Sequence, residues 1–163
     1  MDTIETLTAR ITALEDRQAI ADLIAGYGPA VDSLDGAGAA VIWARDGVYQ
    51  IGPGWTFDGR AAITALPELP QHRGYVAQGC AHFLSPHKIV LAGARATAHG
   101  YSLVLLHDAA SGRWVVERAS ANRWDFAKTA EGWQAVTRRA DLLNGEAAAV
   151  ALLTWSNPQG DVK

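Results

Sequence analysis

Five histidines and a single cysteine are the residues of this chain that most readily supply acid–base, nucleophilic or metal chemistry. Their spacing does not favour a metal site, because neither a His-x-His nor a His-Glu-x-x-His motif occurs. The nearest pair, His82 and His87, would face opposite sides of a strand. We expect His87 and His99 at the surface or rim, His72 in a loop, and Cys80 as an inert buried thiol. The remaining chemistry is proton transfer by an imidazole near neutral pH, which requires neither a metal nor an organic cofactor.

Other polar side chains recur with strand spacing in the second half of the chain. At the even positions of segment 113–126, Ser120 and Asn122 alternate with aromatic residues on what we expect to be a concave face. In segment 95–107, His107 shares the odd face with His99, and a β-bulge would break either assignment. Ser120 and Asn122 could instead form a cross-strand polar pair, and His107 could be a histidine at a hairpin end.

The elements that would position these residues follow from the apolar periodicity. Helical spacing predicts two consecutive helices or one kinked helix over 3–28, then a short alanine-rich helix to Trp43 with Asp35 as its N-cap. A hairpin near 47–57, a short helix at 60–66 and a loop near 67–74 follow. From residue 80 the pattern predicts antiparallel strands joined by short hairpins, near 81–91, 95–107, 113–126 and 132–142.

Helices followed by long antiparallel strands predict an α+β fold, with the N-terminal helices packed on a strongly curved, mostly antiparallel sheet. We expect one domain over residues 1–163, because the length suits a single core. It would comprise a helical part (3–43), a sheet (46–143) and a tail (145–163). The tail could dock on the sheet, form a lid over a pocket mouth, or lend a strand to a neighbouring subunit.

Composition excludes several classes of protein. Lys and Arg number 14 against 17 Asp and Glu, and no basic stripe occurs, which argues against nucleic acid as a partner. No apolar run approaches the roughly 18–20 residues of a membrane span, so no membrane partner is expected. The acidic start lacks the basic region of a signal peptide, and we expect a cytoplasmic protein.

Three groups of residues carry a resemblance to a known family. They are segment 17–24 with Tyr27 and 31–32; segments 46–49 and 57–59; and Trp124 with 131–133, 138–139 and 144–145. Together they resemble SnoaL-like proteins of the nuclear-transport-factor-like superfamily. The resemblance implies a cone with an internal pocket. It leaves the function open, because the superfamily includes dehydratases, isomerases, cyclases, epoxide hydrolases and non-catalytic subunits.

Within the superfamily, the chain is most similar to scytalone dehydratase, bile-acid dehydratases and the hexachlorocyclohexane dehydrochlorinase. The first and last of these use an Asp–His pair, and Asp32 and His82 stand at the corresponding places. Tyr27 resembles a tyrosine of the bile-acid dehydratases and stands where the dehydrochlorinase has a lysine. His107 and the Ser-x-Asn element at 120–122 resemble active-site groups of scytalone dehydratase.

The resemblance implies that His82 is a general base, that Asp32 orients it, and that Tyr27 donates a hydrogen bond to a developing oxyanion. The expected substrate-binding residues are His107, Ser120, Asn122, Tyr49, Trp43, Trp55 and Trp124. The three catalytic candidates also have structural interpretations. Taken alone, Asp32 suits a turn or N-cap, His82 an ordinary strand position, and Tyr27 the core.

Three hypotheses follow. The first is a cofactor-independent lyase, a dehydratase of a hydrophobic cyclic small molecule. The second is an isomerase like ketosteroid isomerase, or a polyketide cyclase, using the same residues. The third is a non-catalytic ligand-binding or assembly subunit. The resemblance implies a homotrimer first and a homodimer second, and the low charged fraction with six tryptophans fits a buried interface.

Overall fold

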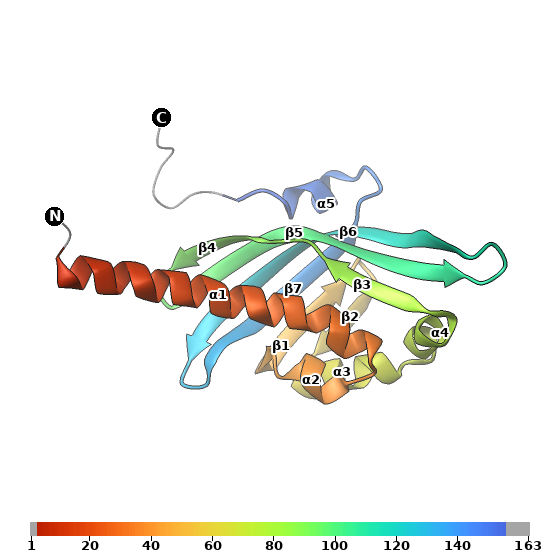
Figure 1. Ribbon diagram of the computed structural model, residues 1–163, viewed down its shortest axis with the longest axis horizontal. Coiled ribbons are helices and arrows are strands. Elements are labelled where there is room, and N and C mark those ends of the chain that lie inside the picture. The colour runs from red at the N-terminus through yellow and green to blue at the C-terminus, as the bar shows by residue number, and fades with distance from the viewer. Residues whose placement is uncertain (1–2, 156–163) are drawn as a thin grey trace.

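One long helix and a seven-stranded sheet dominate the computed structural model, which describes residues 3–155 (Figure 1). In chain order the elements are α1 (Ile4–Asp32), α2 (Gly36–Ala40), β1 (Trp43–Ile51), β2 (Trp55–Asp58), α3 (Arg60–Ala65), the 3-10 helix η1 (Leu66–Glu68), α4 (Pro70–Gln78), β3 (Cys80–Leu84), β4 (Lys88–Ala92), β5 (Arg95–Asp108), β6 (Arg113–Thr129), β7 (Gly132–Leu142) and α5 (Ala147–Ala151).

The strands form one open, curved sheet in the order β2-β1-β7-β6-β5-β3, with β4 also pairing with β5. The β1–β7 pair is parallel and every other pair is antiparallel. The helix α1 crosses one face of the sheet, and α2, α3 and α4 gather near its C-terminal end (Figure 1). This arrangement confirms the α+β class and the helices-on-a-curved-sheet layout predicted from the sequence.

Helix α1 is continuous where the sequence predicts two helices or a kink. It runs through Gly26 and Gly28 and ends at Asp32, with Pro29 in its last turn. Its C-terminal half packs on the sheet through residues that include Ile20 and Ile24. Its N-terminal half projects away from the sheet (Figure 1), and its apolar stripe is exposed at Ile4, Leu7, Ile11 and Leu14.

Several predicted boundaries are wrong in instructive ways. The expected strand 81–91 is two strands, β3 and β4, separated by a segment containing Pro86, and both pair with β5. The expected loop 67–74 holds η1 and α4, because Pro67 and Pro70 stand in the first turn of each, where no backbone N–H is required. The alanine-rich helix stops at Ala40, with Asp35 as its N-cap as predicted.

Two bulges decide which side chains face the helices. The β5–β6 register shifts between Val104 and Leu105, and the β6–β7 register shifts between Asp125 and Phe126. The inner face of β6 therefore carries Arg118, Ser120, Asn122, Trp124 and Phe126, as the even spacing predicts, but Trp114 is turned outward.

The tail packs on the outer face of the sheet, opposite α1 (Figure 1). There α5 contacts β6 and β7, and the Leu152 carbonyl lies 2.7 Å from Nδ1 of His99, a residue of the outer face. The described part of the tail, 145–155, thus does not cover the inner face as a lid. Residues 156–163 of the expected tail lie outside the described residues. Within residues 3–155, no helix is both long and apolar enough to cross a bilayer.

Candidate active site

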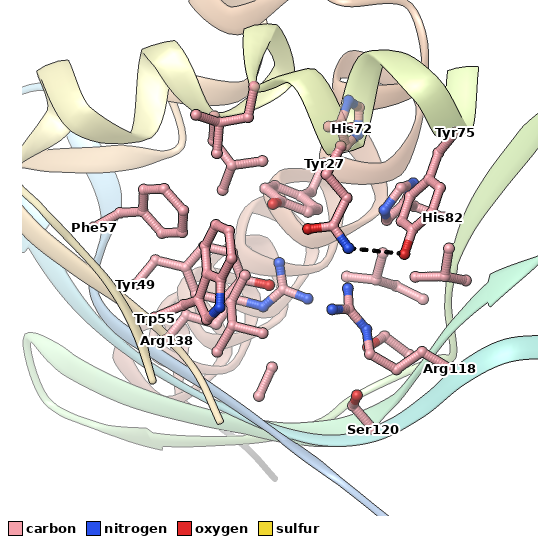
Figure 2. Close-up of a pocket in the computed structure, with 18 residues that line it drawn as sticks. Tyr27, Tyr49, Trp55, Phe57, His72, Tyr75, His82, Arg118, Ser120 and Arg138 are labelled. Carbon is pink, nitrogen blue, oxygen red and sulfur yellow. Dashed lines mark hydrogen bonds between the residues drawn. The ribbon is translucent and has the colours of Figure 1, made fainter. Parts of the chain in front are cut away.

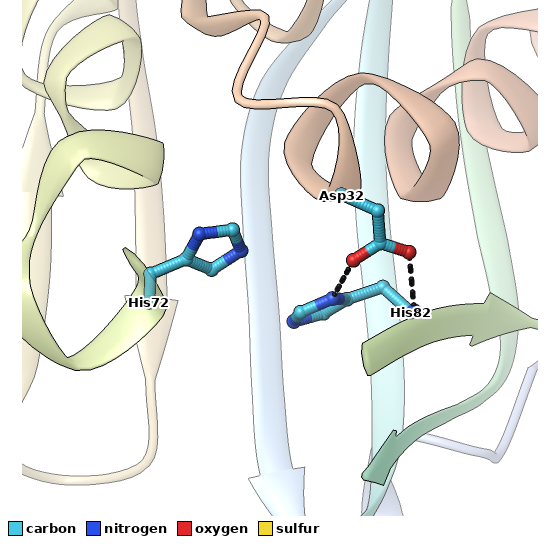
Figure 3. Close-up of side chains that lie close together, drawn as sticks. All are labelled: Asp32, His72 and His82. Atoms are coloured by element: carbon cyan, nitrogen blue, oxygen red, sulfur yellow. Dashed lines mark hydrogen bonds and ion pairs between the residues drawn. The ribbon is translucent and has the colours of Figure 1, made fainter. Parts of the chain in front are cut away.

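Asp32 and His82 form a hydrogen-bonded pair where the end of α1 meets β3 (Figure 3). The Asp32 carboxylate accepts a hydrogen bond from the His82 ring, with Oδ1 2.6 Å from Nδ1, and its Oδ2 accepts the His82 backbone N–H at 2.7 Å. The His82 side chain is 12% exposed. Because Nδ1–H faces the carboxylate, Nε2 carries the free lone pair and can act as a base.

A third donor completes the surroundings of Asp32. The Cys80 thiol, two residues before His82 on the same face of β3, donates to Asp32 Oδ1 at 3.2 Å. Burial alone would raise the pKa of Asp32, but the hydrogen bonds from His82 and Cys80 outweigh it and hold that pKa below its usual value. Burial and the neighbouring carboxylate raise the pKa of Cys80 to about 12, so the thiol stays protonated and serves as a donor.

His72 is a member of the site that the sequence analysis placed in a loop. It lies on α4, is buried, and its ring faces His82 with the centroids 5.2 Å apart (Figure 3). Its Nδ1 donates to the Pro67 carbonyl at 3.1 Å, while Nε2 has no hydrogen-bond partner among the described residues. Burial and the adjacent His82 lower the pKa of His72, so this ring is neutral and offers Nε2 as an acceptor.

These side chains border a cavity of about 160 Å³ between the helices and the inner face of the sheet (Figure 2). Its apolar wall consists of Ile51, Phe57, Leu66, Leu69, Leu84, Val104 and Ala140. Its polar and aromatic wall consists of Tyr27, Tyr49, Trp55, Gln71, His72, Tyr75, His82, Ser102, Arg118, Ser120 and Arg138. A cavity of about 150 Å³ holds a benzene ring, so one six-membered ring fits this space.

The structure brings some of the expected site residues together at this cavity. His82, Tyr27, Tyr49, Trp55 and Ser120 line it, and Asp32 stands behind His82. Burial raises the pKa of Tyr27 well above its ordinary value, so its hydroxyl remains protonated.

Other expected substrate-binding residues lie elsewhere. Trp43 and Trp124 are fully buried core residues whose tilted rings pack against one another, with centroids 5.4 Å apart. Asn122 is also fully buried, and it holds Arg138 instead of lining the cavity. His107 lies on the outer face of β5, because it shares the odd face with His99 while Ser102 and Val104 face the cavity. It pairs there with Trp114, which the bulge in β6 turns outward.

The expectation that His99 lies at the surface or rim is wrong, and His87 is half-buried. His99 is buried beneath α5. The His87 ring packs against Gly100, where a Cβ would come within 2.8 Å of the ring. His99 belongs to β5, His87 lies in the segment between β3 and β4, and neither lines the cavity.

Sequence reasoning missed the two arginines of the cavity. Arg118 stands two residues before Ser120 on the inner face of β6, so strand alternation could have indicated it. Arg138 belongs to the basic pair 138–139, and a bulge at Val136 sets which of the two faces inward. Gln71 and Tyr75, hydrogen-bonded at 3.1 Å on α4, were hidden by the predicted loop.

Arg138 has unusual surroundings for a charged side chain. It is 2% exposed, and Nε and Nη2 donate to Asn122 Oδ1 at 3.0 and 2.8 Å. Its guanidinium carbon lies 4.4 to 4.5 Å from the ring centroids of Tyr27, Tyr49 and Trp124, within cation–π range. Nη1 is buried and has no hydrogen-bond partner among residues 3–155.

Asp32, His72 and His82 could also hold a metal ion, since one ligand atom of each lies within 4.8 Å of the others. Two imidazoles and a carboxylate are a donor set that zinc or ferrous iron accepts. The short Asp32–His82 contact, however, uses Oδ1 and Nδ1 for one another, which leaves the two imidazole Nε2 atoms as the free donors. The arrangement described by the structure is that of a hydrogen-bonded aspartate–histidine pair.

The fold and cavity define an α+β cone of the nuclear-transport-factor-like type, and comparison with known proteins agrees. The SnoaL-like domain pattern matches residues 12–139, and the chain belongs to this family. An NTF2-like protein with a cystatin-like fold from Novosphingobium aromaticivorans is 45% identical, with a TM-score of 0.91, over 95% of this chain and 99% of that one.

More distant structures share the fold. The hexachlorocyclohexane dehydrochlorinase LinA-type3 from Novosphingobium barchaimii is 16% identical, with a TM-score of 0.70, over 82% of this chain and 90% of that one. A variant of Rv3472 from Mycobacterium tuberculosis, described as of unknown function, is 21% identical, with a TM-score of 0.69, over 90% of this chain and 87% of that one. Among curated proteins, no match is found.

Proposed function

We propose that this protein is a cofactor-independent lyase, a dehydratase acting on a hydroxylated cyclic small molecule. The observation that carries the proposal is the Asp32–His82 hydrogen bond of 2.6 Å, which leaves His82 Nε2 free at a cavity of ring size. Geometry of this kind satisfies the first requirement for a general base, which contributes about 10²–10⁴-fold to a rate.

The reaction needs one proton acceptor and one stabilised oxygen. His82 Nε2 takes a proton from the carbon beside a ring carbonyl, and the electron pair of the C–H bond forms an enolate. The enolate then re-forms the carbonyl, a C=C bond forms, and the C–O bond of the β-hydroxyl breaks. The departing oxygen takes the proton from the His82 imidazolium and leaves as water, so one residue serves both steps on one face of the ring.

Two other groups of the cavity wall suit the remaining tasks. The hydroxyl of Tyr27 stays protonated and can donate to the enolate oxygen. The unpartnered Nε2 of His72 can accept a hydrogen bond from a substrate hydroxyl, which would orient the leaving group toward His82. Asp32 keeps its charge and steadies the imidazolium while it holds the proton.

The comparisons support a lyase without deciding the substrate. The dehydrochlorinase neighbour is named for removing hydrogen chloride, which is also an elimination. An isomerase or cyclase would use the same base and oxyanion donor, and a non-catalytic binding subunit would need neither. Product mass separates a dehydratase from an isomerase, because only the dehydratase product is lighter than the substrate by one water.

The test is a screen of hydroxylated cyclic ketones for loss of water, with wild type and His82→Ala compared under identical conditions. We expect His82→Ala to lose about 10²–10⁴-fold in rate and to regain part of it with added imidazole. Circular dichroism and thermal unfolding check that the variant is folded. An unchanged rate in a folded His82→Ala variant would contradict the proposed base.

Self-association and a cytoplasmic location stay predictions. The exposed apolar stripe of Ile4, Leu7, Ile11 and Leu14 on the projecting half of α1 is consistent with contact between copies of this chain. Light scattering on the purified protein measures the mass, for which we expect a homotrimer first and a homodimer second. A monomer at micromolar concentration would contradict this prediction.

A further inference from the structure

The cavity holds two positive charges that no carboxylate of the described chain neutralises. Arg138 makes no ion pair there, and its hydrogen bonds go to the neutral amide of Asn122. Arg118 also lines the cavity and has no hydrogen bond or ion pair within residues 3–155. Figure 2 shows both guanidinium groups directed into the same space. None of the cavity-lining residues is an aspartate or glutamate, and Asp32 behind the wall is paired with His82.

A buried charge without a partner is costly, because desolvation is not repaid by a counter-ion. The rings of Tyr27, Tyr49 and Trp124 offset part of this cost for Arg138 through cation–π contacts. They do not satisfy Nη1, which is buried and donates to nothing in the described part of the chain. A negative charge supplied by a ligand in the cavity would offset the desolvation cost of the two guanidinium groups.

We propose that the substrate carries a carboxylate and that Arg118 and Arg138 bind it. Guanidinium groups match the planar geometry of carboxylates and form the stronger, charge-assisted hydrogen bonds. The cavity of about 160 Å³ leaves room for one ring beside the carboxylate. The substrate class is therefore a monocyclic carboxylic acid, with its acid group at the arginines and its reacting carbon beside His82.

The inference rests on the proposed function for the choice of site, yet anion binding needs no catalysis. Benzoate and its neutral isostere benzamide are suitable probes, because they differ in charge and hardly in shape. Isothermal titration calorimetry at pH 7.5 measures both affinities for wild type, Arg118→Gln and Arg123→Gln. Arg123 is the matched control, because it lies on the same strand but is exposed and paired with Asp125.

We expect benzoate to bind wild type about tenfold or more tightly than benzamide. Arg118→Gln should remove most of that preference without weakening benzamide, and Arg123→Gln should keep it. His82→Asn should still prefer benzoate even if it abolishes turnover, which separates this inference from the proposed reaction. Equal binding of the two probes by wild type would overturn the inference, as would an unchanged preference in Arg118→Gln. Arg138 is not the primary test, because its removal from the core could unfold the protein.

Discussion

The backbone of Gly28 in α1 lies directly against the carbonyl of His82 in β3. A Cβ at position 28 would come within 2.2 Å of that carbonyl oxygen and 3.3 Å of its carbon. Both contacts are to backbone, so neither side can move away without separating the helix from the strand. Gly28 and Asp32 are one helical turn apart on the same face, which means that this close approach also brings the carboxylate to His82.

Gly28→Ala should therefore destabilise the protein and impair the site together. We expect a loss of about 1–3 kcal/mol in the free energy of unfolding, typical of overpacking, and a fall in activity because Asp32 moves away from His82. Gly26→Ala is the matched control, because nothing lies within 4 Å of a Cβ there. It should stabilise the helix by about 0.5–1 kcal/mol and leave activity unchanged. Urea unfolding measures the stability of the two variants, and the rate of water loss measures their activity. Equal stability and equal activity of Gly28→Ala and Gly26→Ala would contradict the packing argument.

Asp32→Asn tests the orienting role of the carboxylate. The amide can no longer steady an imidazolium, and it can present its NH₂ group to Nδ1, which would favour the wrong tautomer of His82. We expect kcat/KM to fall by about 10²-fold or more. Asp35→Asn is the control: Asp35 caps α2 through a hydrogen bond from Gly38 N–H at 2.8 Å, and asparagine caps helices about as well. A similar loss in both variants would assign Asp32 a structural role only.

The fold was more predictable than the site because periodicity is a local property. The helix over 3–28, the cap at Asp35 and the long hairpins all follow from spacing within a few residues. The errors arose at prolines, which can begin a helix as well as end an element. Pro70 starts α4 instead of ending an element, and Pro86 divides a strand whose two halves still pair with β5.

The site depends on contacts that spacing cannot reveal. Asp32 and His82 are 50 positions apart, and only the family resemblance linked them. His72 was missed because its helix was predicted to be a loop. Arg138 was missed because a buried charge contradicts the ordinary preference of arginine for the surface, and because its orientation depends on a bulge.

Stability should fall at mildly acidic pH because of His87. Burial lowers its pKa to about 4, and the nearby Arg138 and His99 act in the same direction, whereas the unfolded chain titrates near 6.5. A histidine with a depressed folded-state pKa contributes full stability above pH 6.5, and this contribution is lost as the pH falls toward 4. The free energy of unfolding lost over this pH range amounts to about 3 kcal/mol. Urea unfolding at pH 7.5 and 4.5 should show a smaller difference for His87→Gln than for wild type. The same difference in both proteins would rule out His87 as the source.

Zinc should inhibit the protein without being needed by it. The base must present an unliganded Nε2, and the Asp32–His82 hydrogen bond places the proton of the neutral ring on Nδ1. His72 offers a second neutral Nε2, and the ligand atoms of the two rings lie within 4.8 Å. We therefore expect dialysis against EDTA to leave the rate and the melting temperature unchanged, while micromolar zinc inhibits reversibly. His72→Gln should weaken that inhibition, because it removes one of the two imidazoles. Activity lost on chelation and restored by zinc would instead make Asp32, His72 and His82 a catalytic metal centre, and the proposed role of His82 as a free base would be wrong.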